Sequence, residues 1–373
     1  MVVLQLVLPA LLLAAAGPAG ANPTVRVRIA EQVSSVVLRG SELRVQDQLV
    51  RAPQIKAEIV GGELRVAHVA SRDPVRVRAS GEIAVDGRSW PGDLSLVPRP
   101  DGTMDVVNVV PLEPYVDRAV AAEIYADWPQ ESLKAQAVVA RTYALHERSR
   151  RSREPFHLES SVISQQYTTR PVPARIREAV VATRGEYLAY QNKPILAVFH
   201  ASAGGRTASA REVWGVALPY LRSLRSPDAA APNHFWTFEI SVTDLVAALL
   251  EAGLVLGQAP TIEVVQRSES GRVQRLRIGA AELSGRELRQ MLGGRAIRSA
   301  LFEVRVIDDQ VNFLGSGSGH GVGLSQWGAR ELALRGMRYR AILTHYYPGA
   351  VRATLSAYNR ADVGAADPRL SLR

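Results

Sequence analysis

The N-terminal part of the chain alternates between apolar and polar positions. The alternation is clearest at residues 25–29 (VRVRI) and 75–78 (VRVR), where every second residue is apolar. A period of two is typical of strands that bury one face, and pairs such as Gly61-Gly62 are turn signals between strands. The pattern predicts a β-rich module over residues 22–105.

After Pro111 the pattern changes to good helix formers and apolar residues at helical spacing. Pro129 is well placed at the start of a helix, where its missing N–H costs nothing. A compact apolar run at residues 194–200 suits a strand. The expected helices cover residues 112–125, 130–150, 176–183 and, after a glycine-rich segment, 324–335.

A second region of alternation, residues 233–311, predicts a mixed lobe inserted into the helical part. Thr243 and Ser284 are expected to cap its two short helices. The expected strands are residues 236–242 and a hairpin of 262–265 with 273–278. The chain as a whole therefore predicts an α+β fold: a β-rich N-terminal module, a helical core over residues 106–352 with the inserted lobe, and a weakly ordered tail over 353–373.

Composition and charge narrow the class of protein. The 373 residues are 47% hydrophobic and 22% charged, which is typical of a folded chain rather than a disordered one. The absence of cysteine excludes disulfides, thiolate nucleophiles and thiolate zinc sites. The net charge of +9 favours an anionic partner. Because the basic residues are dispersed and no helix-turn-helix or RNA-binding motif is present, we expect no nucleic-acid partner.

The first residues predict export. Residues 2–16 form an apolar run, and Ala19-Gly20-Ala21 follows it, a combination typical of a signal peptide and its cleavage site. The run is shorter than the roughly 20 residues that span a membrane. A buried N-terminal helix or an uncleaved anchor is the alternative. We expect removal of residues 1–21, which leaves an exported protein of the periplasm or cell wall with no stable transmembrane segment.

Glu123 is the first candidate for chemistry. It lies between Ala122 and Ile124 near the end of an expected helix. An apolar setting disfavours the charged carboxylate and raises its pKa, as a general acid at neutral pH requires. The alternative is a solvent-facing helical Glu, because most Glu side chains are exposed.

Lys134 and Arg141 are seven residues apart and therefore share one face of the second expected helix. Two cations beside small or apolar residues can orient a sugar or a carboxylate-bearing substrate. They can equally be surface side chains whose stems cover the core.

Residues 315–323 carry glycine at every second position and contain His320. Such a backbone can approach another surface closely, and Ser325 can begin a helix with free amide groups. The segment is neither a phosphate-binding loop of the Gly-Lys-Ser/Thr type nor a good dinucleotide fingerprint. A flexible linker is the alternative. His320 can act as a base, a ligand or a hydrogen-bonding anchor.

His200 and Ser202 follow the expected strand at residues 194–200. Their spacing indicates hydrolase chemistry only weakly, because no Gly-x-Ser-x-Gly sequence surrounds Ser202. We interpret the segment as the polar lining of a cleft.

Together these segments resemble the stage II sporulation protein D family (SpoIID/LytB). The resemblance covers residues 24–350 in order, and its most specific part is the segment 319–329. The matching segments are residues 123–129 (EIYADWP), 133–144 (LKAQAVVARTYA), 165–167 (QQY), 199–207 (FHASAGGRT), 213–215 (VWG), 319–329 (GHGVGLSQWGA) and 346–349 (YYPG).

The resemblance implies a peptidoglycan lytic transglycosylase, which cleaves the β-1,4 bond between N-acetylmuramic acid and N-acetylglucosamine and leaves a 1,6-anhydromuramoyl end. Glu123 matches the family's catalytic Glu and is expected to act as acid and then as base. A conventional glycosidase uses two carboxylates. Asp127 and Asp117 are the other candidates, but Trp128-Pro129 is expected to end the helix and Asp117 to point away. We therefore favour one carboxylate.

Further family positions are expected to frame a substrate groove between the module, the core and the lobe. The resemblance implies that Lys134 and Arg141 orient the substrate or Glu123, and that Gln165 and Tyr167 bind substrate. The implied cleft or scaffold residues are His200, Ser202, Gly205, Thr207, His320, Ser325 and Gln326. Some family members hold zinc through Cys and His in the loop that here spans residues 156–164. This chain offers only His157 and Glu159 there, a poor zinc site, so we expect no metal and no cofactor.

The partners that the resemblance implies are peptidoglycan glycan strands and a cell-wall amidase. Because the family also carries the label of an amidase enhancer, a non-catalytic wall-binding protein that stimulates an amidase is the alternative function.

Overall fold

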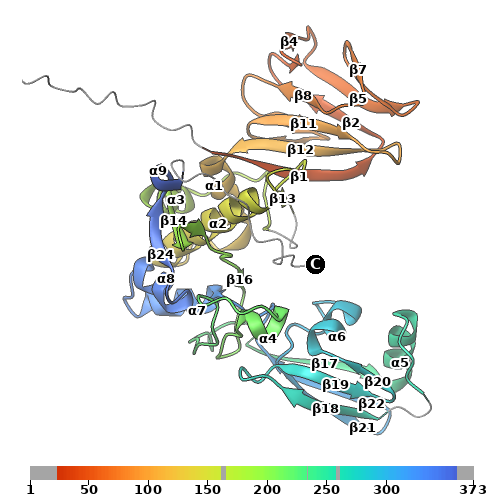
Figure 1. Cartoon of the computed structure of the whole chain (residues 1–373), viewed down its shortest axis with the longest axis vertical. Coiled ribbons are helices and arrows are strands. Elements are labelled where there is room, and N and C mark those ends of the chain that lie inside the picture. Colours follow the sequence, from red (N-terminus) through yellow and green to blue (C-terminus); the bar gives the residue numbers. More distant parts are fainter. Residues whose placement is uncertain (1–22, 161–164, 233, 258–260, 359–373) are drawn as a thin grey trace, which may run out of the picture.

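The computed structural model describes residues 23–160, 165–232, 234–257 and 261–358. The fold is α+β, and Figure 1 shows a β-rich module, a helical core and a smaller lobe, after which the chain returns to the core. Residues 1–21, where we expect a signal peptide, lie outside the described residues. Within the described ranges, no helix combines the length and the apolar character needed to cross a bilayer.

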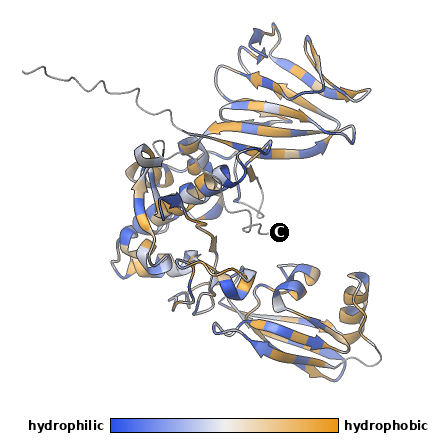
Figure 2. Ribbon diagram, viewed as in Figure 1, coloured by the Kyte–Doolittle hydropathy of each residue, from blue (hydrophilic) through white to orange (hydrophobic). Residues whose placement is uncertain are grey.

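The strands of the module alternate in burial as the sequence predicts. In β8, Val75 and Val77 are buried and Arg76 between them is exposed, and Figure 2 shows apolar and polar residues alternating along such strands. The strands are β1 (Thr24–Val33), β2 (Ser35–Arg39), β3 (Arg44–Val45), β4 (Gln48–Leu49), β5 (Gln54–Val60), β6 (Glu63–Val66), β7 (Val69–Ser71), β8 (Val75–Arg78), β9 (Ile83–Val85), β10 (Arg88–Trp90), β11 (Asp93–Pro98) and β12 (Met104–Pro111).

These strands form two sheets whose buried residues belong to one hydrophobic core. The first sheet has the order β13-β1-β12-β11-β8-β3-β4, and the second has the order β10-β9-β2-β5-β6-β7. The edge strand β13 (Leu158–Glu159) comes from beyond the first two helices and pairs with β1 in parallel. This pairing joins the module to the helical core.

The long helix α2 (Gln130–Arg150) is the centre of the core. Contacts from several sides bury most of it between Ser132 and Leu145, so α2 has no single apolar face. The helices packed around it are α1 (Leu112–Glu123), α3 (Ala174–Ala182), α7 (Gln326–Leu334) and α8 (Tyr339–Tyr346). Smaller elements of the core are β14 (Glu186–Tyr190), β15 (Lys193–Pro194), β16 (Phe199–His200), α4 (Ala210–Trp214), β23 (Leu324–Ser325), β24 (Val351–Thr354) and α9 (Leu355–Tyr358).

The lobe has its own hydrophobic core, in which Trp236, Phe302 and Phe313 are buried. Two three-stranded sheets, β17-β22-β21 and β18-β19-β20, build it together with two helices. The elements are β17 (Phe235–Ser241), α5 (Val242–Glu251), β18 (Ile262–Arg267), β19 (Val273–Ile278), β20 (Ala281–Leu283), α6 (Gly285–Leu292), β21 (Phe302–Ile307) and β22 (Gln310–Ser316).

Two local expectations for caps and strands were wrong. Ser241 rather than Thr243 caps α5, because the Ser241 hydroxyl accepts the N–H of Asp244 at 3.0 Å. The expected strand at 194–200 is reduced to its ends, in β15 and β16, while the residues between them are buried without pairing as a strand. The expected Ser284 cap of α6 is correct and forms a capping box with Glu287.

The chain is ordered into regular elements beyond residue 353, where we expected a weakly ordered tail. β24 pairs with β14, and Tyr358 of α9 packs against Tyr187 with ring centres 6.0 Å apart. This aromatic contact fixes α9 on the core. The rest of the expected tail, residues 359–373, lies outside the described residues.

Candidate active site

Glu123 is the last residue of α1, and the chain turns into an extended conformation at Ile124. The Oε1 atom of Glu123 accepts the backbone N–H of Gln166 at 2.7 Å. Burial raises the pKa of Glu123 above its ordinary value, and the hydrogen bond from Gln166 opposes this only in part. The carboxyl group is therefore partly buried and keeps its proton to a higher pH than an exposed Glu does.

The glycine-rich segment reaches Glu123 through the start of α7. Ser325 caps α7 by accepting the N–H of Gly328 at 3.2 Å, as the sequence suggests. The next residue, Gln326, donates its side-chain amide to the backbone carbonyl of Glu123 at 3.3 Å. Two segments far apart in sequence thus meet at the carboxyl-bearing end of α1.

Aromatic side chains lie directly after Glu123. The ring of Tyr125 is 5.7 Å from that of Trp128, which contacts the ring of Trp327 at 4.8 Å. Tyr125 is 67% exposed, and the guanidinium of Arg330 lies over both Trp rings. We had not placed these residues in the site; their signal was the density of aromatics on either side of Glu123 and Gln326.

Gln165 and Tyr167 point into the protein rather than toward a substrate. Gln165 accepts the hydroxyl of Tyr115 at 2.8 Å, and Tyr167 donates its hydroxyl to Asn108 at 2.9 Å. Both side chains are buried. Instead of contacting substrate as expected, these two side chains hold residues 165–167 against the core. The backbone N–H of Gln166 between them is thereby presented to Glu123.

Arg141 is also inside the protein, with no exposed surface. Its guanidinium donates to both oxygens of Glu113, at 2.9 and 2.7 Å, and to the carbonyl oxygen of Glu186 at 3.1 Å. The expectation that Arg141 contacts substrate was wrong, because the face of α2 that carries it is covered by other elements of the core. Its negative partner is Glu113.

Lys134, on the same helix, is paired rather than open. Its ammonium group is 2.7 Å from Glu131 and lies 5.9 Å from the centre of the Tyr339 ring. Glu131 in turn accepts the N–H of Tyr339 at 2.8 Å. The contacts of Lys134 therefore join α2 to α8.

The segment from His200 to Thr207 is a scaffold for the glycine-rich segment. β16 pairs in parallel with β23, and Ser202 exchanges backbone hydrogen bonds with Ser318. The hydroxyl of Thr207 donates to the carbonyl of Arg222 at 3.0 Å. These contacts place the side chains of His200, Ser202 and Thr207 in buried positions, and Gly205 alone of the four predicted residues here is exposed.

His320 is a hydrogen-bonding anchor. Its Nδ1 atom accepts the N–H of Val322 at 3.0 Å, and its Nε2 atom donates to the carbonyl of Phe199 at 2.9 Å. Burial is the main cause that lowers the pKa of His320, to about 4. The ring is neutral with both nitrogens engaged, so of its three possible roles the anchor fits.

Asp228 holds the scaffold together and was missed by the sequence analysis. Its buried carboxylate accepts the N–H groups of Ala203 and Gly205, the latter at 2.8 Å, and the hydroxyl of Ser325 at 2.8 Å. The hydroxyl of Ser226 adds a contact at 3.3 Å. Asp228 thereby connects the His200 segment to the first turn of α7 and, through Gln326, to Glu123.

The residues considered for zinc have other contacts. His157 accepts the N–H of Arg26 at 3.1 Å, and Glu159 pairs with Arg28 at 3.0 Å. Burial lowers the pKa of His157 to about 3. In the part of the chain that the structure describes, no three His, Asp or Glu side chains gather as metal ligands would. Residues 161–164 of the same loop lie outside that part.

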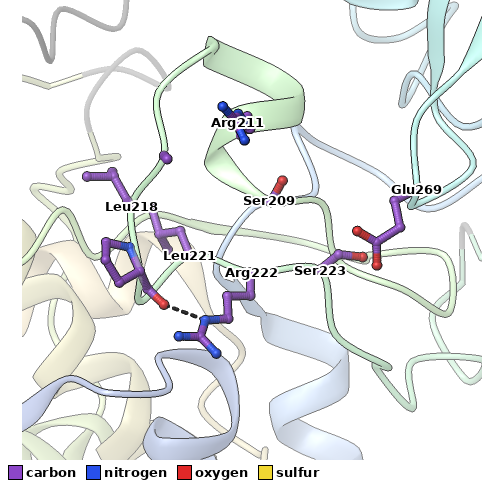
Figure 3. Close-up of a pocket in the computed structure, with 9 residues that line it drawn as sticks. Ser209, Arg211, Leu218, Leu221, Arg222, Ser223 and Glu269 are labelled. Atoms are coloured by element: carbon purple, nitrogen blue, oxygen red, sulfur yellow. Dashed lines mark hydrogen bonds between the residues drawn. The ribbon is translucent and has the colours of Figure 1, made fainter.

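A cavity of about 400 Å³ beside α4 is separate from these residues. Ser209, Arg211, Leu218 and Arg222 line it, and Glu269 reaches it from the lobe (Figure 3). No residue that the sequence predicts for the site lines this cavity. We therefore do not count it as part of the candidate active site.

Comparisons with known proteins support the sequence motifs. A family model described as stage II sporulation protein matches residues 100–190, and a domain of unknown function (DUF8618) matches residues 225–323. An uncharacterised protein of Brachyspira hyodysenteriae is 34% identical over 278 residues, 74% of this chain and 74% of that protein. Stage II sporulation protein D of Bacillus amyloliquefaciens is 33% identical over 261 residues, 65% of this chain and 74% of the relative. An amidase enhancer of Bacillus subtilis is 26% identical over 286 residues, 63% of this chain and 39% of the relative.

Proposed function

The chain belongs to the stage II sporulation protein D family, and from this premise we propose that it is an exported peptidoglycan lytic transglycosylase with Glu123 as its catalytic acid and base. The substrate is a glycan strand of the cell wall. The observation that carries the proposal is the partly buried carboxyl group of Glu123, whose pKa is raised and whose position two segments fix.

The proposed reaction needs one carboxyl group because the substrate supplies its own nucleophile. Protonated Glu123 gives its proton to the bridging oxygen as the bond from the muramoyl C1 to that oxygen breaks. The muramoyl C6 hydroxyl then attacks the oxocarbenium-like C1, and its proton passes to Glu123. The intramolecular attack avoids the entropy cost of a second reactant, and the enzyme returns to its starting protonation state.

The neighbouring side chains support a sugar substrate. Tyr125 presents an exposed ring beside Glu123, and Trp128 and Trp327 continue the aromatic surface. Aromatic rings have flat apolar faces with polar edges, which suit the faces of sugar rings. Asp127 is exposed at the surface, so of these two carboxyl groups Glu123 is the one whose environment suits an acid.

A direct test measures cleavage of purified glycan strands, with mass spectrometry of 1,6-anhydromuramoyl ends. Glu123→Gln should lower the rate by about two to four orders of magnitude, the usual contribution of general acid–base catalysis. The control Asp127→Asn removes the nearest exposed carboxyl group and should keep the rate. Equal product from wild type and Glu123→Gln contradicts the role of Glu123, whereas equal loss in both variants shows that Asp127 acts as a second carboxylate and contradicts the single-carboxylate mechanism.

The second candidate is a wall-binding protein that stimulates an amidase, favoured by the similarity to the amidase enhancer. In that case neither wild type nor Glu123→Gln forms anhydromuramoyl ends. Both proteins would then increase peptide release by an added wall amidase to the same extent. The same purified proteins therefore separate the two functions.

A further inference from the structure

A cavity of about 520 Å³ lies where the lobe meets the core. Its walls come from α4, from the start of β19, from α6 and from Gly319-His320. Figure 1 shows α4 and α6 next to each other at this junction. The volume lies within the range of about 300–1,000 Å³ typical of small-molecule sites.

Three arginines line this cavity: Arg272, Arg286 and Arg289. Arg272 is almost completely buried and donates to the carbonyls of Ala203 and Arg206, at 2.9 and 3.0 Å. Its Nε atom is buried and has no hydrogen-bond partner among the described residues. Burying a cation whose N–H group has no hydrogen-bond acceptor costs folding free energy, and a bound ligand with an acceptor atom would remove that cost.

Arg289 is a second arginine of the cavity that has no carboxylate partner among the described residues. Its Nε atom donates to the carbonyl of Arg298 at 3.2 Å, and burial lowers its pKa. None of the ion pairs in the described part of the chain includes Arg289. The guanidinium therefore lines the cavity without a carboxylate to neutralise it.

The two acidic residues of the cavity form hydrogen bonds with neutral groups, and the charge of one of them, Glu212, also acts on Arg272. Glu287 accepts the N–H and hydroxyl of Ser284, at 2.6 and 2.8 Å, in the capping box of α6. Glu212 accepts the hydroxyl of Ser270. Three arginines and two glutamates line the cavity, which gives the lining one net positive formal charge. Besides burial, the three arginine charges lower the pKa of His320 in the cavity wall.

The remaining wall suits a sugar ring. The indole of Trp214 lies 5.5 Å from the ring of His320, and both line the cavity. The side chain of Gln290 lines it as well. An aromatic face, an amide and the guanidinium groups of Arg272 and Arg289, which form no ion pair among the described residues, are together groups that can hold an acidic saccharide.

We propose that this cavity binds a carboxylate-bearing saccharide, with Arg289 as the partner of the carboxylate and Trp214 as the surface for the sugar ring. The identity of the sugar rests on the proposed function: in a peptidoglycan strand it is N-acetylmuramic acid, with its lactyl carboxylate or a peptide carboxylate attached to it. The site lies on the lobe side of the glycine-rich segment and adds a specificity element to a strand held at Glu123.

Isothermal titration of the full chain tests this with three probes: N-acetylmuramic acid, N-acetylmuramoyl-L-alanyl-D-isoglutamine and N-acetylglucosamine. One or both of the acidic probes should bind, and the neutral sugar should bind about tenfold more weakly or worse, because a charged hydrogen bond is lost. Binding of the first probe alone identifies the lactyl carboxylate, and binding of the second alone identifies a peptide carboxylate. Equal binding of the neutral sugar, or no binding of either acid, overturns the proposal.

Arg289→Gln should weaken binding of the acidic probes about tenfold, whereas Arg305→Gln, an exposed arginine on β21 of the same lobe, should not. If Arg289→Gln fails to fold, the salt dependence of wild-type binding replaces it, since added salt screens an interaction with a carboxylate. Unchanged affinity in a folded Arg289→Gln protein, or salt-independent binding, overturns the proposal. Titration of Glu123→Gln keeps the two proposals distinguishable. If this variant loses cleavage but still binds the acidic probes, the cavity is a binding site independent of catalysis. If the wild type cleaves glycan but binds neither acidic probe, only the proposal for the cavity fails.

Discussion

The side-chain amide of Gln326 donates a hydrogen bond to the backbone carbonyl of Glu123, although 203 residues separate the two. The carbonyls in the last turn of a helix have no partner within the helix. Gln326 supplies such a partner at the end of α1, from which the Glu123 carboxyl group emerges. The first turn of α7 therefore fixes the position of the proposed catalytic group.

Gln326→Ala should lower the rate of glycan cleavage more than it lowers stability. The lost hydrogen bond is worth about 0.5–1.5 kcal/mol of unfolding free energy, whereas a misplaced acid can cost up to about a hundredfold in rate. Initial rates of anhydromuramoyl formation and urea denaturation measure both. The matched control is Gln130→Ala, which removes an amide that donates to the carbonyl of Arg175 at 3.2 Å. Equal losses of rate in the two variants would remove any special role of Gln326.

The raised pKa of Glu123 predicts a stability gain from Glu123→Gln at high pH. A carboxyl group whose pKa is raised by folding stabilises the protein below its unfolded pKa, and this contribution is lost as pH rises through the folded pKa. Gln stays neutral and its oxygen can still accept the N–H of Gln166. The variant should therefore melt at a higher temperature than wild type near about pH 8, and the difference should shrink toward about pH 4.

Glu131→Gln provides a control in which the expected change in melting temperature has the opposite sign. Burial raises the pKa of Glu131, but the hydrogen bonds from Lys134 and from the Tyr339 N–H outweigh this and leave the pKa lowered. Its stabilising contribution is present above the unfolded pKa and is lost as pH falls. Glu131→Gln should therefore melt below wild type near neutral pH. A Glu123→Gln protein that behaves in the same way would show that Glu123 is not a destabilised carboxylate.

Removal of Arg141 should destabilise the core. Arg141→Ala leaves the Glu113 carboxylate buried without its cation, and loss of one partner of a buried pair costs about 3–5 kcal/mol of unfolding free energy. Urea denaturation measures the loss. Arg335→Ala breaks an exposed pair with Glu331 and should cost no more than about 1 kcal/mol. A small loss for Arg141→Ala together with a raised KM for glycan would restore the substrate-binding role that the sequence suggested.

The case of Arg141 shows what the sequence could and could not predict. The alternation of β8 and the full extent of α2 followed from local patterns, because burial of alternate residues and helix-forming side chains act over a few neighbours. Which face of α2 is covered depends on the packing of α1, α3, α7 and α8 around it. The spacing of Lys134 and Arg141 shows that they share a face and leaves open what that face meets.

In the site, too, the residues set by local pattern could be predicted and those set by long-range packing could not. Glu123 could be identified from its neighbours and from its family position, and Ser325 as a helix start from its residue type. Asp228 could not, because its partners at Ala203, Gly205 and Ser325 come together only in the folded chain. A buried acid with several donors leaves no local pattern in the sequence.

Asp228→Asn should therefore weaken the scaffold in a way that involves Ser325. Asn keeps one acceptor oxygen, but its amide group would face a backbone N–H or a hydroxyl that now has no acceptor, at a cost of about 1–3 kcal/mol of unfolding free energy. Urea denaturation of Asp228→Asn, Ser325→Ala and the double variant gives their coupling, expected at about 0.5–3 kcal/mol for residues in one network. The control Asp244→Asn changes an exposed acid that accepts the hydroxyl of Ser241 at 2.8 Å and should cost little. Additive effects of the Asp228 and Ser325 changes would show that the carboxylate does not hold the first turn of α7.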